Sequence, residues 1–557
     1  MSADSGAGHS PAGQEQTAPV VIAGGGPVGL MLAIELCLGG VTPIVLERLP
    51  EISDIPKGNG LVGQIVPVLD YRGLLDRLRA GSTYNGPVPG FSFGPLRLEF
   101  SGESPLQILA VPQRRLEHVL AARLAELGGS IRRGHELTEF SQDDEAVTVS
   151  VTGPAGDYLL TTRYLVGCDG AHSQVRKQAG IGFPGFTAPE VSLIGRVTLP
   201  DAVLLAGSGE AELPGLGRIQ LTQQVRTPRG MYSLAPLTSL DATAPKGTYI
   251  VYTREDADPP ANIAGAPDGR RLSDREPPVT LAELQASFRR VTGADVRMTD
   301  PTWLTRTVGN SRQADRYLEG RVLLAGDAAH VFGLALNAGL LDAVNLGWKL
   351  AAQVRGWAPA GLLASYHTER HAAGRRGLLH TRAQRALTGG DEITEAIRDL
   401  LGELLTVPGV ARHLGELIAG TDIRYDMPGS EAGRHPLTGR LAPDLRLAAT
   451  DRSRTRIAEL MRAAGPLLLD FTLDGRVAPE AAGWQERVPA IVVKQLDGPP
   501  AADALLIRPD GYVAWATGPG AADPAAGLRE SLTAWCGTSA ASQRTSGNAA
   551  PRHDPPV

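Results

Sequence analysis

Three glycines near the start of the chain are spaced so that they could hold a phosphate group. Gly24, Gly26 and Gly29 form a Gly-x-Gly-x-x-Gly pattern directly after the apolar run at residues 19–23. In such a pattern the first glycine allows a tight turn, the second lets the backbone approach a diphosphate, and the third lets helix and strand pack closely. The helix that follows would present unpaired N–H groups and the positive end of its dipole to the phosphates.

A carboxylate completes this candidate nucleotide site. Glu47 ends the next apolar run, residues 43–48, where a carboxylate can bind both hydroxyls of an adenosine ribose and would repel a 2′-phosphate. The pattern therefore predicts FAD or NAD in this pocket, and not NADPH. The alternative is a structural turn beside a surface acid; strand, helix and carboxylate occurring together favour the nucleotide.

Two later segments carry further candidate residues. Residues 163–176 predict a strand, a turn at Asp169 and a helix that opens near Ser173, and residues 320–330 predict a buried strand that ends near Asp327. A helix is expected after Asn337. Taken singly, Asp327 could cap a helix and His330 could be a core histidine. Because the segments occur together with the glycine pattern, they indicate one shared site.

These motifs lie on alternating strands and helices. The strand at 19–23, the helix at 30–38 and the strand at 43–48 form one βαβ unit with buried parallel strands. Leucine spacing predicts a helix over 116–127, and alternation at 147–151 predicts an antiparallel strand. Strand-like pieces separated by Gly, Pro and Asp predict a β-rich domain between 189 and 300. Apolar runs at 490–494 and 504–508 begin a small C-terminal α/β domain.

The composition is that of an ordinary globular protein. Of 557 residues, 42% are hydrophobic and 20% are charged, which excludes disorder as the main state. The net charge of −6 argues against a nucleic-acid partner or an anionic membrane surface. The three separated cysteines predict no disulfide framework, and no metal site is expected. Residues 1–18 lack the apolar core of a secretion signal, and the apolar stretch at 19–34 is too short to span a membrane, so we expect a cytoplasmic protein.

The motifs together resemble the class A FAD-dependent aromatic monooxygenases, and most closely the bacterial aromatic-polyketide hydroxylases. The resemblance covers roughly residues 19 to 535 and includes the helix with Asp-Ala-Val-Asn-Leu-Gly-Trp-Lys-Leu at 342–350. It implies an α/β fold in which a Rossmann-type FAD-binding domain (19–188 and 301–410) contains an inserted β-rich substrate domain (189–300). A linker and a thioredoxin-like domain would follow at 411–537, between tails at 1–18 and 538–557 that we expect to be disordered. The last domain has no Cys-x-x-Cys, which excludes a dithiol redox role.

The resemblance also assigns roles to single residues. Gly24, Gly26 and Gly29 would hold the FAD diphosphate, and Glu47 with Arg48 would hold the adenosine end. Gln113 matches a position near the diphosphate and ribityl region, and Asp327 would hold the ribityl chain. Asp169 belongs to a motif tied to both FAD and the reduced nicotinamide. The helix N-terminus at Asn337 would face the pyrimidine end of the flavin and stabilise its anionic reduced form.

The implied activity is oxidation of a polycyclic aromatic polyketide by hydroxylation or by Baeyer–Villiger insertion. NAD(P)H would reduce the flavin, which with dioxygen gives a hydroperoxide that oxidises the substrate. We therefore expect no side-chain nucleophile, and the sequence names no catalytic base. The link at residues 331–336 is shorter than in relatives and lacks their proline. It could reposition the flavin within ordinary oxygenase chemistry. Alternatively, the fold could have lost oxygenation and act as a dehydratase, a cyclase or a non-catalytic flavoprotein. A homodimer is possible.

Overall fold

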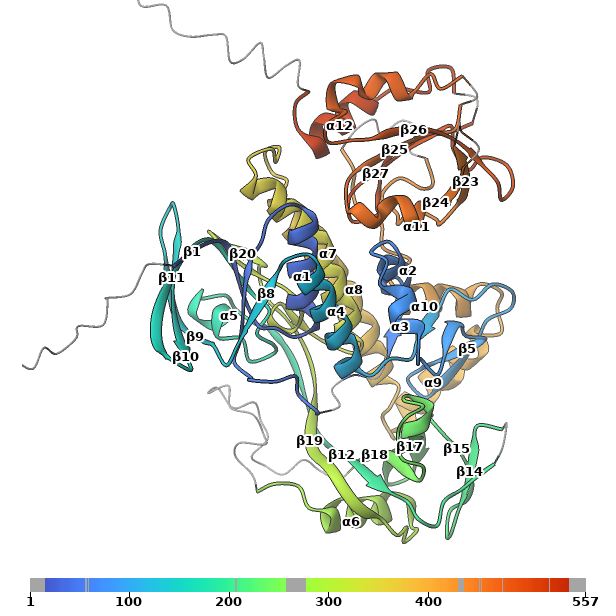
Figure 1. The fold of residues 1–557 in the computed structure, drawn as a ribbon. Helices are drawn as coiled ribbons and strands as arrows, with labels where there is room; N and C mark the ends of the chain where they lie inside the picture. The colour runs from blue at the N-terminus through green and yellow to red at the C-terminus, as the bar shows by residue number, and fades with distance from the viewer. Residues whose placement is uncertain are drawn as a thin grey trace, which may run out of the picture.

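The structure is a computed structural model that describes residues 16–55, 58, 60–205, 208–256, 277–428, 435–449, 451, 453–472, 474–519 and 521–539. Most of both expected tails lies outside the described residues. The exceptions are residues 16–18, which already form part of a strand, and residues 538–539. The α/β fold class predicted from the sequence is confirmed (Figure 1).

The first sheet is built on the apolar runs that the sequence marks as buried strands. Its order is β20-β21-β11-β1-β2-β8, and β11 also pairs with β10, which pairs with β9. β21, β11, β1, β2 and β8 run parallel to one another, as a βαβ unit requires, whereas β20 pairs antiparallel with β21, and β10 pairs antiparallel with β11 and β9. The strands are β1 (Gln16–Ala23), β2 (Ile44–Glu47), β8 (Ser130–Arg133), β9 (Glu136–Gln142), β10 (Val147–Gly153), β11 (Gly156–Gly167), β20 (Leu318–Glu319) and β21 (Val322–Leu324).

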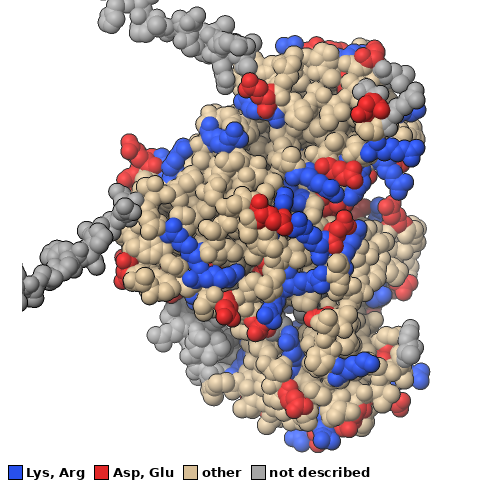
Figure 2. Space-filling view, in the orientation of Figure 1, with Lys and Arg blue, Asp and Glu red and all other residues tan. Residues whose placement is uncertain are grey.

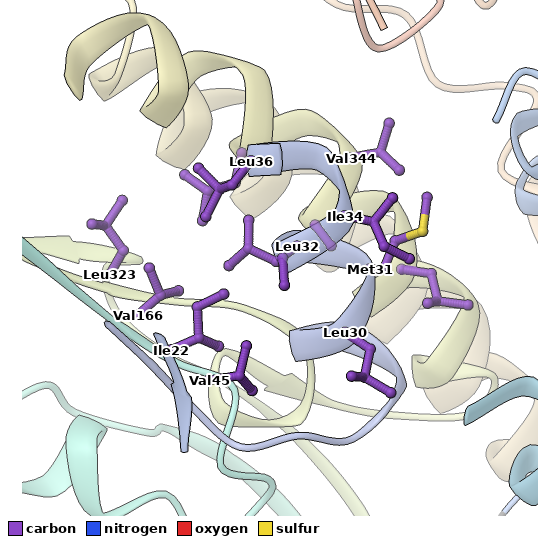
Figure 3. Packing of buried hydrophobic residues seen from close by; sticks show 14 of the residues in the cluster. Ile22, Leu30, Met31, Leu32, Ile34, Leu36, Val45, Val166, Leu323 and Val344 are labelled. Carbon is purple, nitrogen blue, oxygen red and sulfur yellow. The ribbon is translucent and has the colours of Figure 1, made fainter. Parts of the chain in front are cut away.

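Three helices form the layer on this sheet. α1 (Pro27–Leu38) is apolar all round, and it packs between α7 (Ala335–Val354) and α4 (Gln113–Glu126). Figure 3 shows Leu32 and Leu36 of α1 beside Ile22 and Val166 of the sheet. All four side chains are fully buried. This layer therefore fixes the start of α1 and the start of α7 relative to the sheet.

The second sheet has the order β16-β17-β18-β12-β19-β22 and is covered on one face by α6 (Leu281–Thr292). Its long strands β12 (Gly185–Thr198) and β19 (Thr299–Gln313) run through the domain boundaries expected at 188/189 and 300/301. The sheet therefore extends from the lower part of Figure 1 up to the first sheet. The other strands are β16 (Val225–Thr227), β17 (Gly230–Pro236), β18 (Thr248–Glu255) and β22 (His330–Val331), and β13 (Val203–Leu205), β14 (Glu210–Leu213) and β15 (Gly217–Gln220) form a separate small sheet.

Shorter elements surround the helices of the body. Between β2 and α4 lie β3 (Leu61–Val62), α2 (Ile65–Asp70), α3 (Leu75–Arg79), β4 (Asn85–Pro87), β5 (Gly90–Phe93), β6 (Leu96–Glu99) and β7 (Gln107–Leu109). After α7 come α8 (Ala364–Ala386), α9 (Glu392–Leu404) and α10 (Val410–Ala419). On the face shown in Figure 2, basic and acidic side chains are interspersed. Among the described residues, no helix combines the length and apolarity needed to cross a membrane.

The C-terminal sheet has the arrangement predicted as thioredoxin-like. Parallel β25 (Leu467–Asp470) and β26 (Ala490–Gln495) are followed by antiparallel β27 (Ala504–Ile507) and β28 (Val513–Thr517), and α12 (Leu528–Cys536) closes the unit. β23 (Arg446–Ala449) and β24 (Arg454–Arg456) extend the sheet beside β26. The short helices of this part are α11 (Ile457–Leu460), η4 (Met461–Ala463) and η5 (Ala478–Trp484).

A buried charged cluster joins this C-terminal unit to α7 and α8. Glu369 of α8 accepts hydrogen bonds from Lys349 Nζ (2.7 Å) and from Arg508 (2.6 and 2.8 Å), which also pairs with Asp510. Asn345 of α7 donates to both Glu369 and Asp510. Burial lowers the pKa of Lys349 to about 8. Removing one member would leave a buried charge without its partner, so the cluster holds α7 firmly against the C-terminal unit.

Candidate active site

Four predicted site segments meet at one edge of the first sheet. β2, β1, β11 and β21 are neighbouring parallel strands, so their carboxyl ends lie side by side. Glu47, Gly24, Asp169 and Asp327 stand at or just beyond those ends. In open α/β sheets this edge is where ligands bind. The structure therefore brings together residues that are far apart in the sequence, such as Gly24 and Asp327.

The fingerprint glycines divide into two that are needed for packing and one that leaves space. A Cβ on Gly24, whose φ is +108°, would lie 2.3 Å from the Cys168 carbonyl oxygen, and one on Gly29 would lie 2.0 Å from the Gly24 carbonyl oxygen. A Cβ on Gly26 would meet no atom within 4 Å. The backbone at the start of α1 is thus open to a ligand at Gly26, while the neighbouring turn is tightly packed.

Glu47 is held in place beside this turn. The Gly25 N–H donates to Glu47 Oε2 (2.8 Å), and the Leu49 N–H donates to Oε1 (2.9 Å). These hydrogen bonds fix the carboxylate at the end of β2, where its remaining lone pairs can accept hydrogen bonds from hydroxyl groups. Arg48 follows the strand, and its side chain is exposed.

Asp169 has one engaged and one free carboxylate oxygen. Its Oδ2 accepts from the Gln174 and Val175 N–H groups (2.7 and 3.1 Å) at the start of α5 (Gln174–Gln178). Its Oδ1 is buried and has no hydrogen-bond partner in the structure. Burial raises the pKa of this carboxyl. A buried acceptor without a donor is costly, so a donor on a bound molecule would stabilise this arrangement.

Asp327 lies in the short helix η3 (Gly326–Ala328), directly after β21, and its side chain is exposed. The strand end is fixed because the Ala325 N–H donates to the Gly167 carbonyl (3.0 Å). A Cβ on Gly326 would lie 2.9 Å from Val28 of α1, and one on Gly339 of α7 would lie 2.9 Å from the Gly326 Cα. The ends of three elements therefore converge at Asp327.

The prediction that the helix starts after Asn337 is wrong. α7 begins at Ala335, because the link after β22 is only Phe332, Gly333 and Leu334, and Leu334 turns the chain with φ +64°. A non-glycine residue in this left-handed region is strained, a feature that concentrates at functional sites. Asn337 thus lies within the first turn of α7.

Asn337 and Gln113 connect two more segments to this helix start. Asn337 is buried, and its Oδ1 accepts from the Val62 N–H of β3 (2.8 Å). Gln113 opens α4, and its backbone N–H donates to the Gly58 carbonyl (2.9 Å). A Cβ on Gly58 would lie 3.3 Å from both the Gln113 Oε1 and Leu336. Gln113 therefore lies beside the beginning of α7, as a shared site requires.

A buried ion-pair network beneath η3 was missed as a site feature. Asp342 of α7 accepts from Arg370 Nε (2.7 Å) and from the Gly326 N–H (3.1 Å), and it pairs with His330 Nε2 (2.6 Å). Burial acts to raise the pKa of Asp342, but His330 and Arg370 hold it below its ordinary value. The sequence shows each residue, but the pairing depends on the packing of α7 on α8.

A cavity of about 1100 Å³ opens between the second sheet and the helices α8 and α9. It is lined by residues of β12, β16 and β18 on one side and by the C-terminal part of α8 and the start of α9 on the other. α8 connects this cavity to the short link before α7: the Gly333 N–H donates to Thr381 Oγ1 (3.2 Å), and Arg382 of the same helix lines the cavity. The volume suits a small polycyclic molecule.

The residues at the sheet edge fit FAD. Gly26 leaves the backbone open for a diphosphate, Glu47 is fixed where a ribose would lie, and Asp169 offers a buried acceptor without a donor. Within the described ranges, no group of three or more His, Cys, Asp or Glu side chains is arranged to hold a metal ion.

Comparisons with known proteins agree with this site. Residues 17–380 match the family described as "FAD binding domain", and residues 435–539 match "Aromatic-ring hydroxylase, C-terminal". The chain is 40% identical over 538 residues to the 12-dehydrotetracycline 5-monooxygenase/anhydrotetracycline 6-monooxygenase of Streptomyces rimosus, covering 93% of this chain and 98% of that protein. It is 38% identical over 509 residues to the rifampicin monooxygenase of Streptomyces venezuelae, covering 89% and 95%.

A solved structure gives the same result for the fold. The anhydrotetracycline hydroxylase OxyS from Streptomyces rimosus superposes with a TM-score of 0.80 at 38% identity, and the alignment covers 94% of this chain and all of that one. The predictions of a flavin-dependent monooxygenase and of FAD as its cofactor are confirmed. The chain belongs to the family of FAD-dependent aromatic-ring monooxygenases.

Proposed function

We propose that this monooxygenase oxidises a polycyclic aromatic polyketide, with NAD(P)H as reductant and dioxygen as oxidant. The observation that carries the proposal is the cavity of about 1100 Å³ between the second sheet and the helices α8 and α9. It provides room for a polycyclic molecule against α8, the helix that also binds the link before α7. The named activities of the tetracycline and rifampicin monooxygenases support the same substrate class.

The chain's own residues would bind and orient FAD. Gly26 would admit the diphosphate to the backbone, and Gly24 and Gly29 would keep the turn beside it closely packed. Glu47 would accept hydrogen bonds from the ribose hydroxyls, and the exposed Arg48 would reach the adenosine end. When bound, FAD supplies the electron transfer and the activation of dioxygen.

The remaining predicted residues would contact the middle and the flavin end of the cofactor. Gln113 would contact its middle section and Asp327 its ribityl chain, and Asp169 would accept a hydrogen bond at Oδ1. Asn337 would act indirectly by holding Val62 and the first turn of α7 in register. The N-terminus of α7 offers a positive dipole end that stabilises negative charge on a nearby ring.

The short link at 332–334 favours a repositioned flavin over a lost activity. Its turn is held by hydrogen bonds from Ala335 N–H to the Phe332 carbonyl (3.2 Å) and from Asn337 N–H to the Leu334 carbonyl (3.0 Å). The helix start therefore remains ordered without the longer glycine-rich segment of relatives. Hydroxylation and Baeyer–Villiger insertion both remain compatible with this arrangement.

The test is aerobic turnover of a tetracyclic polyketide in heavy dioxygen with NADPH or NADH, followed by mass spectrometry. We expect the product to gain one heavy oxygen atom, with flavin reduction stimulated by substrate. Product formed without dioxygen or reductant would instead support a dehydratase or cyclase. FAD binding without turnover of any such substrate would support a non-catalytic flavoprotein.

The homodimer and the cytoplasmic location stay predictions. Sedimentation velocity of the FAD-loaded protein tests the first, and fractionation of the producing cells tests the second.

A further inference from the structure

The two faces of the second sheet differ in character. Alternate residues of its strands, such as Leu193 and Val197 of β12 and Val251 of β18, pack in the core against α6. Because side chains alternate along a strand, the residues between them point to the opposite face. There Glu190 of β12 and Arg254 of β18 line the cavity. The face of this sheet that lines the cavity therefore carries charged side chains. An aromatic ligand without charged or polar groups would instead favour an apolar face.

Arginine dominates the lining of this cavity. Five arginines face it against four carboxylates, and Phe186 is its aromatic side chain among the described residues. The arginines are Arg226, Arg254, Arg382, Arg385 and Arg398. Guanidinium groups bind carboxylates and other oxyanions through paired N–H donors.

Three of these arginines are engaged by the protein itself. Arg385 donates twice to Glu190 (3.0 and 2.7 Å). Arg226 pairs with Asp256 and donates to the Thr388 carbonyl (2.5 Å). Arg398 donates to the Leu387 and Gly389 carbonyls (3.0 and 2.7 Å), so its role is to hold the loop before α9.

Arg254 and Arg382 are not engaged in this way. The Nε of Arg254 is buried and has no hydrogen-bond partner, and the nearest carboxylate of its ion pair, Asp256, lies 3.9 Å away and already binds Arg226. Arg382 donates to the Ser311 carbonyl at 3.3 Å and forms no ion pair within the described part of the chain. Arg254 lines the cavity, and among the described residues its guanidinium has no carboxylate closer than Asp256 at 3.9 Å, so a ligand that supplies an acceptor would stabilise it.

We infer that the substrate carries an ionised acidic group, a carboxylate or an acidic phenol, that Arg254 binds with help from Arg382. The inference rests on the proposed function and narrows its substrate class. Phe186 is 42% exposed and offers apolar surface to an aromatic ring, while the Arg385 guanidinium lies over one face of it, 4.8 Å from the centre of the ring. The cavity thus combines a stacking surface with an anion-binding group, as an acidic polycyclic aromatic compound requires.

The test measures binding of matched probes to the FAD-loaded protein by calorimetry. The acidic probes are anthraquinone-2-carboxylate and 2-hydroxyanthraquinone in its ionised form, and the neutral probes are the methyl ester and methyl ether of the same compounds. We expect at least one acid to bind about tenfold more tightly than its neutral partner, since a charge-assisted hydrogen bond is lost in the latter. The acid that shows the preference identifies the group.

Variants separate recognition from folding. Arg254→Gln should weaken binding of the acidic probe about tenfold and leave binding of the neutral probe unchanged. Arg254→Lys should retain part of the preference for the acidic probe over the neutral one. Arg290→Gln is the matched control, because Arg290 pairs with Glu255 on the outer surface of α6 and is 55% exposed.

Several results would overturn the inference. They are equal binding of acid and neutral probes by the wild type, no binding of any probe, equal weakening of both by Arg254→Gln, and displacement of the acid by adenosine 2′,5′-bisphosphate, which would assign the site to the nicotinamide donor. Heavy-oxygen incorporation is scored separately. Oxidation without acid preference refutes this inference alone, whereas Arg254-dependent acid binding without oxidation refutes the proposed function alone.

Discussion

Gly26→Ala should abolish tight FAD binding without unfolding the protein. The new Cβ would meet no atom within 4 Å, and the backbone of Gly26 has φ −75° and ψ −176°, which alanine adopts freely. Since this residue caps α1, the free energy of unfolding should fall by no more than about 1 kcal/mol. The methyl group would instead fill the space through which a diphosphate approaches the backbone. FAD affinity should therefore fall by about 100-fold or more, which corresponds to about 2.7 kcal/mol.

Two measurements on the same preparations decide this prediction. Urea unfolding of the apoprotein gives the stability, and quenching of flavin fluorescence during titration gives the FAD dissociation constant. Gly402→Ala in α9 is the control, because its Cβ also meets no atom within 4 Å but lies in another helix. It should leave FAD affinity unchanged. Gly29→Ala should prevent folding, because its Cβ would overlap the Gly24 carbonyl oxygen at 2.0 Å.

The result that would refute the reasoning is unchanged FAD affinity in Gly26→Ala. A dissociation constant equal to that of the wild type would mean that the diphosphate does not pass Gly26. Loss of folding in this variant would mean that the space beside Gly26 belongs to the packed core.

Three further predictions concern buried polar groups. Asp342→Asn should lower the free energy of unfolding, measured in urea, by about 3 kcal/mol or more, because Arg370 would keep a buried charge without its partner. A decrease of less than about 1 kcal/mol would contradict this. Asn337→Leu should cost about 1–3 kcal/mol, since it leaves the Val62 N–H without an acceptor, and Asn337→Asp, which keeps an acceptor oxygen, should cost less. Burial lowers the pKa of His380 from 6.5 to about 4, so between these pH values the unfolded chain binds a proton that the folded chain does not. The free energy of unfolding should therefore fall by about 3 kcal/mol as the pH drops from 6.5 to 4. His380→Gln should remove this part of the pH dependence. The same decrease between pH 6.5 and 4 in the wild type and the variant would disprove the prediction.

Local features of the first βαβ unit were predictable because each depends on neighbouring residues. Gly24, Gly26 and Gly29 appear where the turn requires them, and Glu47 ends the strand β2 as expected. The start of α7 was not predictable, because it depends on Leu334 adopting a left-handed conformation that leucine seldom takes. The domain boundaries expected at 188/189 and 300/301 fall inside β12 and β19, since hydrogen bonding continues where the composition changes.

The order of strand, glycine turn, helix and carboxylate was readable from the chain because backbone geometry and side-chain periodicity act over a few residues. Only the packed molecule decided that Asn337 binds Val62, that Asp342 holds Arg370, and that Arg254 faces the same cavity as Arg382. Each of these contacts joins residues of different helices or strands, and the distance between the two residues is set by strand register and helix packing. Such contacts leave no fixed spacing in the sequence.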